Sequence, residues 1–356
     1  MMKELTLKRA STDICPGIKD GIALLNLARG WLKQGNAVVA IELLKSARNS
    51  VEAGRNQQLR AQILKETGRA LMMQSDWESS EAHYLEAQQV FLDIEDHKGA
   101  SECVRNRANM YFQKGRFADS EELCRQALEW ASVVGDYELR ATILNTLGAI
   151  KSATGELKEA VRVFKLCLAD FESSGNRLRQ GYVLLNIGLA QIELSESDEA
   201  IVSLNQALAM ALDEKDLSLV EICYQNISKC YLAQKETNLA KSVIDTARKI
   251  LPGLNSKALE TELNLIDCQI MRTMGNLHGA HQLLEKTYDM AIDHKLHALQ
   301  ADVLFEQGLL EKQRGRPELA VTKLDAAANQ YKLIGVDKGF RQTVQALENL
   351  KRSNNG

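Results

Sequence analysis

A step of forty residues recurs through this chain of 356 residues and limits what the chain can fold into. Counting by forty finds a small residue at one position of every copy: Ala28, Gly68, Ala108, Gly148, Gly188, Ser228, Cys268 and Gly308. A second small position follows twelve residues later: Ala40, Ser80, Ser120, Ala160, Ala200, Ala240, Ala280 and Ala320. A repeat without insertions predicts a stack of similar units, each burying its apolar face against its neighbours.

Each copy has the pattern of two amphipathic helices joined by a turn. In residues 143–176, Gly148 lies in the first helix, Gly155 at the turn, and Ala160, Phe164 and Cys167 in the second. The turn column is Gly35, Ser75, Gly115, Gly155, Ser195, Lys235, Gly275 and Gly315. Strand-like alternation is absent, so the pattern predicts an all-α protein.

These columns resemble the tetratricopeptide repeat family over nearly the whole chain. The family places a small residue in helix A, then a turn, then Ala, a large apolar residue and Ala in helix B, as in Ala320, Leu324 and Ala327. The step of forty departs from the usual 34 residues and resembles the long-helix subgroup. HEAT and armadillo repeats, with periods near forty, are the alternative.

The resemblance implies a right-handed α-solenoid of eight helix hairpins followed by a C-terminal capping helix. We expect an N-terminal tail at residues 1–16, the eight-repeat solenoid at 17–335, the capping helix at 336–352 and a disordered tail at 353–356.

Composition excludes several classes of function. The net charge is -3 with acids and bases interspersed, which argues against nucleic-acid binding. No apolar run approaches the roughly 20 residues of a membrane span, and no secretory signal is recognisable. Seven cysteines without a CxxC pair indicate a reducing compartment, and we expect the cytoplasm.

In the family, helix A lines the concave surface, and binding positions follow from each small residue. Two positions before it stand four asparagines, Asn26, Asn106, Asn186 and Asn226. In related long-helix proteins such a ladder holds the main chain of an extended peptide, because an amide both donates and accepts. The full set of expected partner-binding residues is Asn26, Arg29, Lys65, Arg69, Arg105, Asn106, Asn109, Asn145, Asn186, Leu189, Asn226, Lys229 and Phe305.

The charge along these positions is uneven. The first three repeats present Arg29, Lys65, Arg69 and Arg105, whereas later ones present apolar residues such as Leu189 and Phe305. This predicts a protein or peptide partner with an acidic segment and apolar anchors. The alternatives are that the basic residues form ordinary solvated helix faces and that the asparagines make local hydrogen bonds.

No motif for catalysis, cofactor binding or metal binding is present. His278 and His281 lie three residues apart, as do His294 and His297, but no further ligands complete a metal motif. We therefore expect a non-enzymatic adaptor that needs no cofactor. A peptide-sensing signalling regulator and an accessory factor for an enzyme complex are the alternatives, and the oligomeric state stays open.

Overall fold

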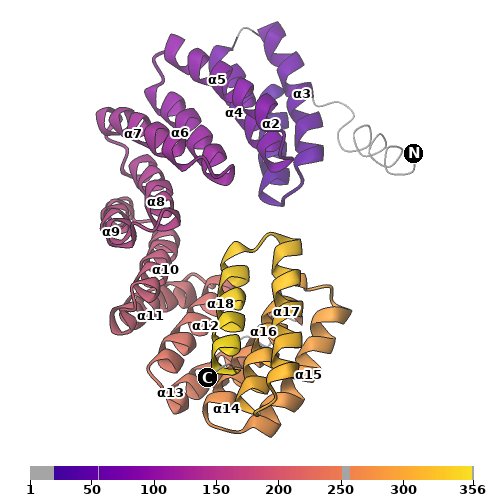
Figure 1. Cartoon of the computed structure of the whole chain (residues 1–356). Coiled ribbons are helices and arrows are strands. Elements are labelled where there is room, and N and C mark those ends of the chain that lie inside the picture. Colours follow the sequence, from indigo (N-terminus) through magenta and orange to yellow (C-terminus); the bar gives the residue numbers. More distant parts are fainter. Residues whose placement is uncertain (1–19, 55, 251–256, 355–356) are drawn as a thin grey trace, which may run out of the picture. The chain divides into compact units, whose positions relative to one another are not determined.

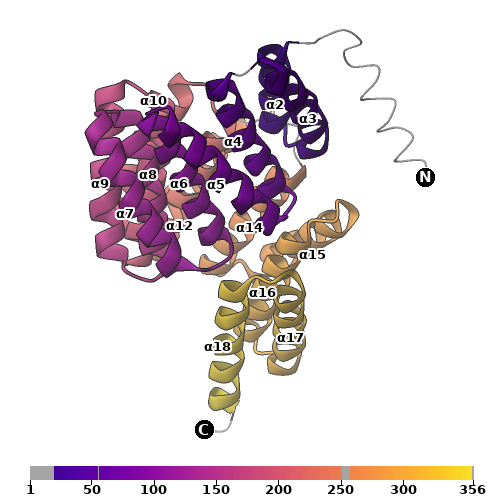
Figure 2. The same cartoon turned by 90° about the horizontal axis from the view of Figure 1, so that it is seen from above.

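The computed structural model of the chain describes residues 20–54, 56–250 and 257–354, and every regular element in these ranges is an α-helix. The chain divides into two compact units, Met1–Asn176 and Arg177–Gly356. Figures 1 and 2 show a succession of antiparallel helix hairpins in each unit. The expected all-α solenoid of eight hairpins and a terminal helix is confirmed.

Unit 1 contains four hairpins. Their helices are α2 (Gly21–Lys33) and α3 (Ala37–Gly54), α4 (Gln57–Met73) and α5 (Trp77–Asp93), α6 (His97–Gln113) and α7 (Phe117–Val134), and α8 (Tyr137–Ala153) and α9 (Leu157–Ser174).

Unit 2 contains the other four hairpins and the terminal helix. The hairpins are α10 (Arg177–Glu193) and α11 (Ser197–Asp213), α12 (Leu217–Ala233) and α13 (Thr237–Ile250), α14 (Lys257–Thr273) and α15 (Leu277–Asp293), and α16 (His297–Gln313) and α17 (Pro317–Ile334), followed by α18 (Asp337–Asn354). The terminal helix thus runs two residues beyond the expected 352. The N-terminal tail at 1–16 and the last two residues lie outside the described residues.

The small column of helix A is explained by the large residue that faces it. A Cβ at Gly148 would lie 2.5 Å from the ring of Phe164, and one at Gly308 would lie 2.6 Å from Leu324. Both partners are buried. The two helices of a hairpin can therefore approach closely only where helix A has little or no side chain.

The turn column is explained by backbone conformation. Each of its eight residues has a positive φ, from +60° at Ser75 to +83° at Gly155. Glycine adopts this left-handed region without a steric cost, which accounts for the five glycines of the column. Ser195 and Lys235 adopt it at φ 63° and 64°.

Contacts between repeats place the A helices on a common inner layer of each unit. Helix α4 contacts α2 and α6, and α14 contacts α12 and α16. The terminal helix α18 contacts α16 as a ninth A helix would. Side chains on the exposed face of neighbouring A helices therefore lie next to one another.

Two properties of the described residues complete the fold. No helix in this part of the chain is both long and apolar enough to cross a membrane. Six cysteines, all those after Cys15, are buried and form no disulfide among the described residues, and burial raises the pKa of five of their thiols. These thiols fill the core.

Candidate functional site

All thirteen residues predicted to bind a partner lie on A helices. Unit 1 holds Asn26 and Arg29 on α2, Lys65 and Arg69 on α4, Arg105, Asn106 and Asn109 on α6, and Asn145 on α8. Unit 2 holds Asn186 and Leu189 on α10, Asn226 and Lys229 on α12, and Phe305 on α16.

In unit 1 the basic residues of neighbouring A helices are joined by carboxylates of the same surface. The carboxylate of Glu66 lies 3.0 Å from Nε of Arg29 and 3.7 Å from Nη1 of Arg69. Lys65 forms an ion pair with Glu102. The surface is thus a network of alternating charges, in which Arg69 is the most exposed of these three cations at 43% of its side chain.

Two members of the asparagine column, Asn106 and Asn226, make local hydrogen bonds. Nδ2 of Asn226 donates to the carbonyl of Ile222 one turn earlier, at 2.8 Å. Oδ1 of Asn106 accepts from Arg105 at 2.7 Å. Each amide keeps a second group: Oδ1 of Asn226 and Nδ2 of Asn106 appear in no further hydrogen bond of the described residues. A partner's main chain could use these groups.

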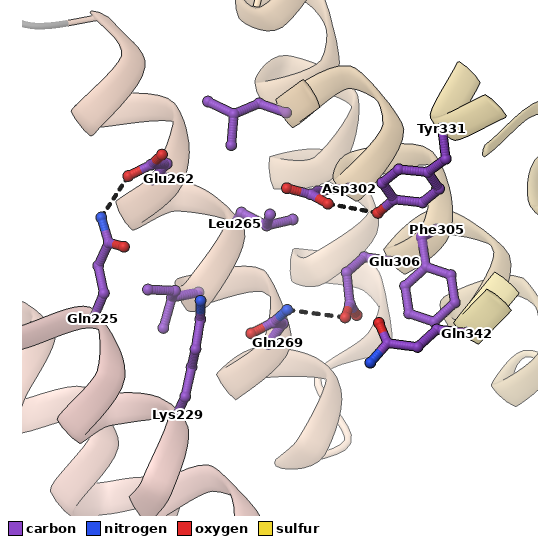
Figure 3. Close-up of a pocket in the computed structure, with 12 residues that line it drawn as sticks. Gln225, Lys229, Glu262, Leu265, Gln269, Asp302, Phe305, Glu306, Tyr331 and Gln342 are labelled. Atoms are coloured by element: carbon purple, nitrogen blue, oxygen red, sulfur yellow. Dashed lines mark hydrogen bonds between the residues drawn. The ribbon is translucent and has the colours of Figure 1, made fainter. Parts of the chain in front are cut away.

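Unit 2 contains a cavity of about 280 Å³ between its A helices. Figure 3 shows its walls, which come from α12, α14 and α16, with one residue each from α17 and α18. Two predicted residues, Lys229 and Phe305, meet there. The complete lining is Gln225, Lys229, Glu262, Leu265, Ile266, Gln269, Leu299, Asp302, Phe305, Glu306, Tyr331 and Gln342.

The lining follows the repeat. Gln225, Leu265 and Phe305 lie three positions before the small residues of their helices, so each A helix contributes the same side of its surface. Another column lies six positions before the small residue and supplies Glu262, Asp302 and Gln342. Helix α18 continues the register as a ninth A helix, so its residue in this column, Gln342, is the third that lines the cavity.

Glu306 is the most buried carboxylate of the lining, with 6% of its surface exposed. Burial raises its pKa, and Arg272 opposes that shift. Nε of Arg272 lies 3.1 Å from Oε2, while Nε2 of Gln269 donates to Oε1 at 2.9 Å. Both oxygens are thus satisfied from α14, and the group ties α16 to that helix.

Asp302 stands beside Tyr331, whose hydroxyl donates a hydrogen bond to Oδ1. Burial raises the pKa of Asp302, and the Tyr331 hydrogen bond and the charge of Lys229 both oppose the rise. Burial and the neighbouring carboxylate raise the pKa of Tyr331 in turn. The phenol therefore remains the proton donor of the pair.

Glu262 and Glu221 form a second acidic group at the edge of the cavity. Nε2 of Gln225 donates to both, at 3.3 Å to Glu221. Burial and the negative charge of Glu262 raise the pKa of Glu221 to about 7. Two carboxylates that share one donor disfavour each other's ionisation.

The sequence reasoning missed the acidic members of the cavity. Glu262 and Asp302 lie three positions before Leu265 and Phe305, which puts them on the same helix face one turn earlier. That spacing could have revealed them. Tyr331 could not be found in this way, because it comes from helix B and reaches Asp302 only through the packing of α16 on α17.

The histidine pairs carry no assembled metal site. His281 lies 3.6 Å from Oε1 of Glu311, which also pairs with Arg314 at 2.7 Å. Across the described residues, no group of three or more His, Cys, Asp or Glu side chains is arranged to hold a metal ion.

Repeated hairpins whose A helices share one lined surface define a helical-repeat protein of the scaffold class. The tetratricopeptide repeat family model matches residues 100–173. Protein KINESIN LIGHT CHAIN-RELATED 1 of Arabidopsis thaliana is 24% identical over 251 residues, and KINESIN LIGHT CHAIN-RELATED 2 of the same plant is 27% identical over 213 residues. These matches cover 66% and 57% of this chain but only 41% and 32% of the relatives. Residues 100–173 thus match the tetratricopeptide repeat, which favours this family over the HEAT and armadillo alternative.

Solved structures agree on the fold. The apo form of RapI has a TM-score of 0.66 at 14% identity and covers 93% of this chain and 98% of its own. A Rap protein complexed with competence and sporulation factor has a TM-score of 0.56 at 14% identity, covering 94% and 98%. BtubC from P. vanneervenii has a TM-score of 0.54 at 18% identity, covering 66% and 92%. At these identities the likeness is one of fold.

Proposed function

We propose that the protein is a non-catalytic adaptor that binds an extended segment of a partner protein along the exposed faces of its A helices. The observation that carries this proposal is the unit 2 cavity, which combines apolar side chains with amide and charged groups and is lined mostly by A-helix positions, with Tyr331 added from helix B. A concave surface on which apolar side chains stand beside converging polar groups is typical of sites that take a side chain or small ligand.

Backbone recognition follows from the amides. Gln225 and Asn226 lie on α12 and Gln269 on the next A helix, α14, and each can offer a donor or an acceptor to a peptide unit. A bound main chain needs such groups, because its own N–H and C=O groups lose water on binding.

In unit 1 the proposed contacts are polar. Arg69 is partly exposed and shares the carboxylate of Glu66 with Arg29, while Lys65 pairs with Glu102. An acidic segment of the partner would compete with Glu66 and Glu102 for these cations, so its contribution to affinity is modest and falls as salt is added. Apolar anchors would pack on Leu189 and Phe305.

We also place the adaptor in the cytoplasm. The buried cysteines of the described residues, which form no disulfide, support this proposal, because thiols persist in a reducing compartment.

The test is affinity capture from source lysate with quantitative mass spectrometry. Two variants remove surface side chains: Arg69→Ala/Arg105→Ala/Asn106→Ala in unit 1, and Gln225→Ala/Lys229→Ala in unit 2. The matched control is Lys158→Ala/Lys165→Ala, two exposed lysines on the B helix α9.

The proposal expects the same partners with wild type and control, and a loss of about tenfold or more with at least one inner-surface variant, which corresponds to the few kcal/mol that central contacts supply. Partners that persist unchanged on both inner-surface variants would place the binding surface elsewhere.

A further inference from the structure

The unit 2 cavity has a charge that its own residues leave unbalanced. Its lining contains three carboxylates, Glu262, Asp302 and Glu306, and one ammonium group, that of Lys229. Arg272 compensates Glu306. Among the described residues, no lysine, arginine or histidine lies within ion-pair distance of Glu262 or Asp302.

Both of these carboxylates are instead held by neutral donors. Gln225 donates to Glu262, and the hydroxyl of Tyr331 donates to Asp302. Figure 3 shows the two hydrogen bonds, one on each side of Leu265. Neutral donors fix the direction of a carboxylate and leave its negative charge in place, so each group keeps acceptor capacity for a cation.

The surroundings make that charge costly in the empty cavity. Burial raises the pKa of Asp302, and the proximity of Glu262 raises the pKa of Glu221. Like charges that face one concave site also reinforce one another's field. A cation that enters would relieve both effects.

The remaining walls fit the stem of a long side chain. Leu265, Ile266 and Leu299 are apolar, and the ring of Phe305 lies beside Tyr331. Basic side chains combine an apolar stem with a charged head, and their heads bind well against aromatic rings. The volume of about 280 Å³ is at the small end for ligand sites, which suits one side chain better than a whole small molecule.

We infer that this cavity is a subsite for a basic side chain, arginine or lysine, of the partner segment: its head lies between Glu262 and Asp302, and its stem packs on Leu265 and Phe305. The inference rests on the proposed function and adds a charge preference to it. In unit 2 the apolar stem of this basic side chain is thus the part of the partner that packs on Phe305, and its charged head adds the preference for a cation.

The test uses three probe peptides that differ in one side chain: acetyl-Ala-Ala-Arg-Ala-Ala-amide and its citrulline and glutamate counterparts. Citrulline has the shape of arginine without the charge. The full chain carries labelled Ile and Leu methyl groups, and titrations follow the resonances of Leu265, Ile266 and Leu299 by NMR, which detects millimolar binding.

The expected result is saturable shifts at these methyl groups with the arginine peptide, at least about tenfold weaker binding of the citrulline peptide, and none of the glutamate peptide. The variant Asp302→Asn/Glu262→Gln should lose at least about tenfold in arginine-peptide affinity. The control Asp325→Asn removes one negative charge from an exposed position on α17 and should bind as wild type does. Added salt should weaken arginine-peptide binding to wild type, which tests the charge without any substitution.

Equal affinities for arginine and citrulline peptides would overturn the inference and leave peptide binding by the adaptor intact. Arginine-peptide binding that survives Asp302→Asn/Glu262→Gln, or preference for glutamate, would overturn it as well. Failure of all three peptides to shift these methyl groups would also overturn it, while the capture experiment on the inner-surface variants decides the proposed function separately.

Discussion

The hydroxyl of Tyr331 on α17 donates to the carboxylate of Asp302 on α16, and both side chains line the unit 2 cavity. The bond joins the two helices of the last hairpin at the floor of the candidate site. It also opposes the effect of burial on the pKa of Asp302. Packing within a hairpin thus determines the charge that the cavity presents to a partner.

Replacing Tyr331 with phenylalanine removes this donor. Because a hydrogen bond to the charged form lowers a pKa, Tyr331→Phe should raise the pKa of Asp302 further above its usual value. Carboxyl carbon NMR titration of labelled Asp measures this directly. The control is Tyr288→Phe on α15, which makes no hydrogen bond to Asp302 in the described residues. An unchanged or lowered pKa of Asp302 in Tyr331→Phe would contradict the assigned hydrogen bond.

A second prediction concerns the pH dependence of stability. The pKa of Glu221 is raised from 4.5 to about 7 in the folded protein by burial and by Glu262. The folded state therefore holds this proton more tightly than the unfolded state. The contribution of Glu221 to stability falls as the pH rises from about 4.5 through about 7. The variant Glu221→Gln stays neutral and lacks this loss.

Thermal unfolding of wild type and Glu221→Gln near pH 5 and near pH 8 checks this sign. The variant should gain about 1–3 °C relative to wild type at the higher pH, a small value because the side chain is half-buried and solvent screens it. The control Glu348→Gln, at an exposed position on α18, should show no such difference between the two pH values. A relative gain at the lower pH instead would show that the sign is wrong.

A third prediction compares two glycines inside A helices. A Cβ at Gly148 would lie 2.5 Å from the Phe164 ring, whereas one at Gly30 would have no atom within 4 Å. Gly148→Ala should therefore destabilise the protein by about 1–3 kcal/mol through overpacking. Gly30→Ala should stabilise it by about 0.5–1 kcal/mol, because alanine loses less backbone entropy in a helix.

Urea unfolding followed by circular dichroism distinguishes the two. Because repeat proteins can lose neighbouring units separately, the comparison uses midpoints of the first transition as well as of the whole curve. If Gly148→Ala matched Gly30→Ala, close packing at Phe164 would not explain the small column.

These glycines also show what the sequence could predict. The small, large and turn columns follow from local geometry that repeats eight times, and Gly148, Phe164 and Gly155 sufficed to predict the hairpin. The thirteen binding candidates fell on A helices because the register of the repeat defines each helix face. The ion pairs of Arg29 and Lys65 involve carboxylates from the next repeat along the chain. Comparing equivalent positions of the repeats, one column at a time, does not show which residues of neighbouring repeats meet.

The negative charge of the cavity could not be predicted from the repeat columns either, for a different reason. Leu265 and Phe305 line the cavity, but its net charge depends on which groups are compensated. Arg272 pairs with Glu306, while Asp302 is held by a tyrosine hydroxyl from helix B. Such pairings depend on tertiary packing and produce no periodic pattern in the sequence.

The last prediction uses the turn column. Lys235 adopts φ 64° in the turn between α12 and α13, where five of the eight repeats have glycine. The left-handed conformation costs an L-residue about 1–2 kcal/mol, and the greater chain entropy of unfolded glycine offsets part of this. Lys235→Gly should therefore stabilise unit 2 by roughly 0.5–1 kcal/mol, seen as a thermal midpoint higher by about 1–3 °C.

Two further variants isolate the cause. Lys235→Asn removes the same charge but keeps a side chain that tolerates positive φ, so it should give a smaller gain of the same sign. Gly155 has φ +83°, and a Cβ there would have no atom within 4 Å, so a substitution changes only the backbone strain. Gly155→Ala should therefore destabilise unit 1 by about 1 kcal/mol. A midpoint that falls in Lys235→Gly would mean that the lysine ammonium, next to the carbonyl end of α12, stabilises the turn more than its backbone strain destabilises it.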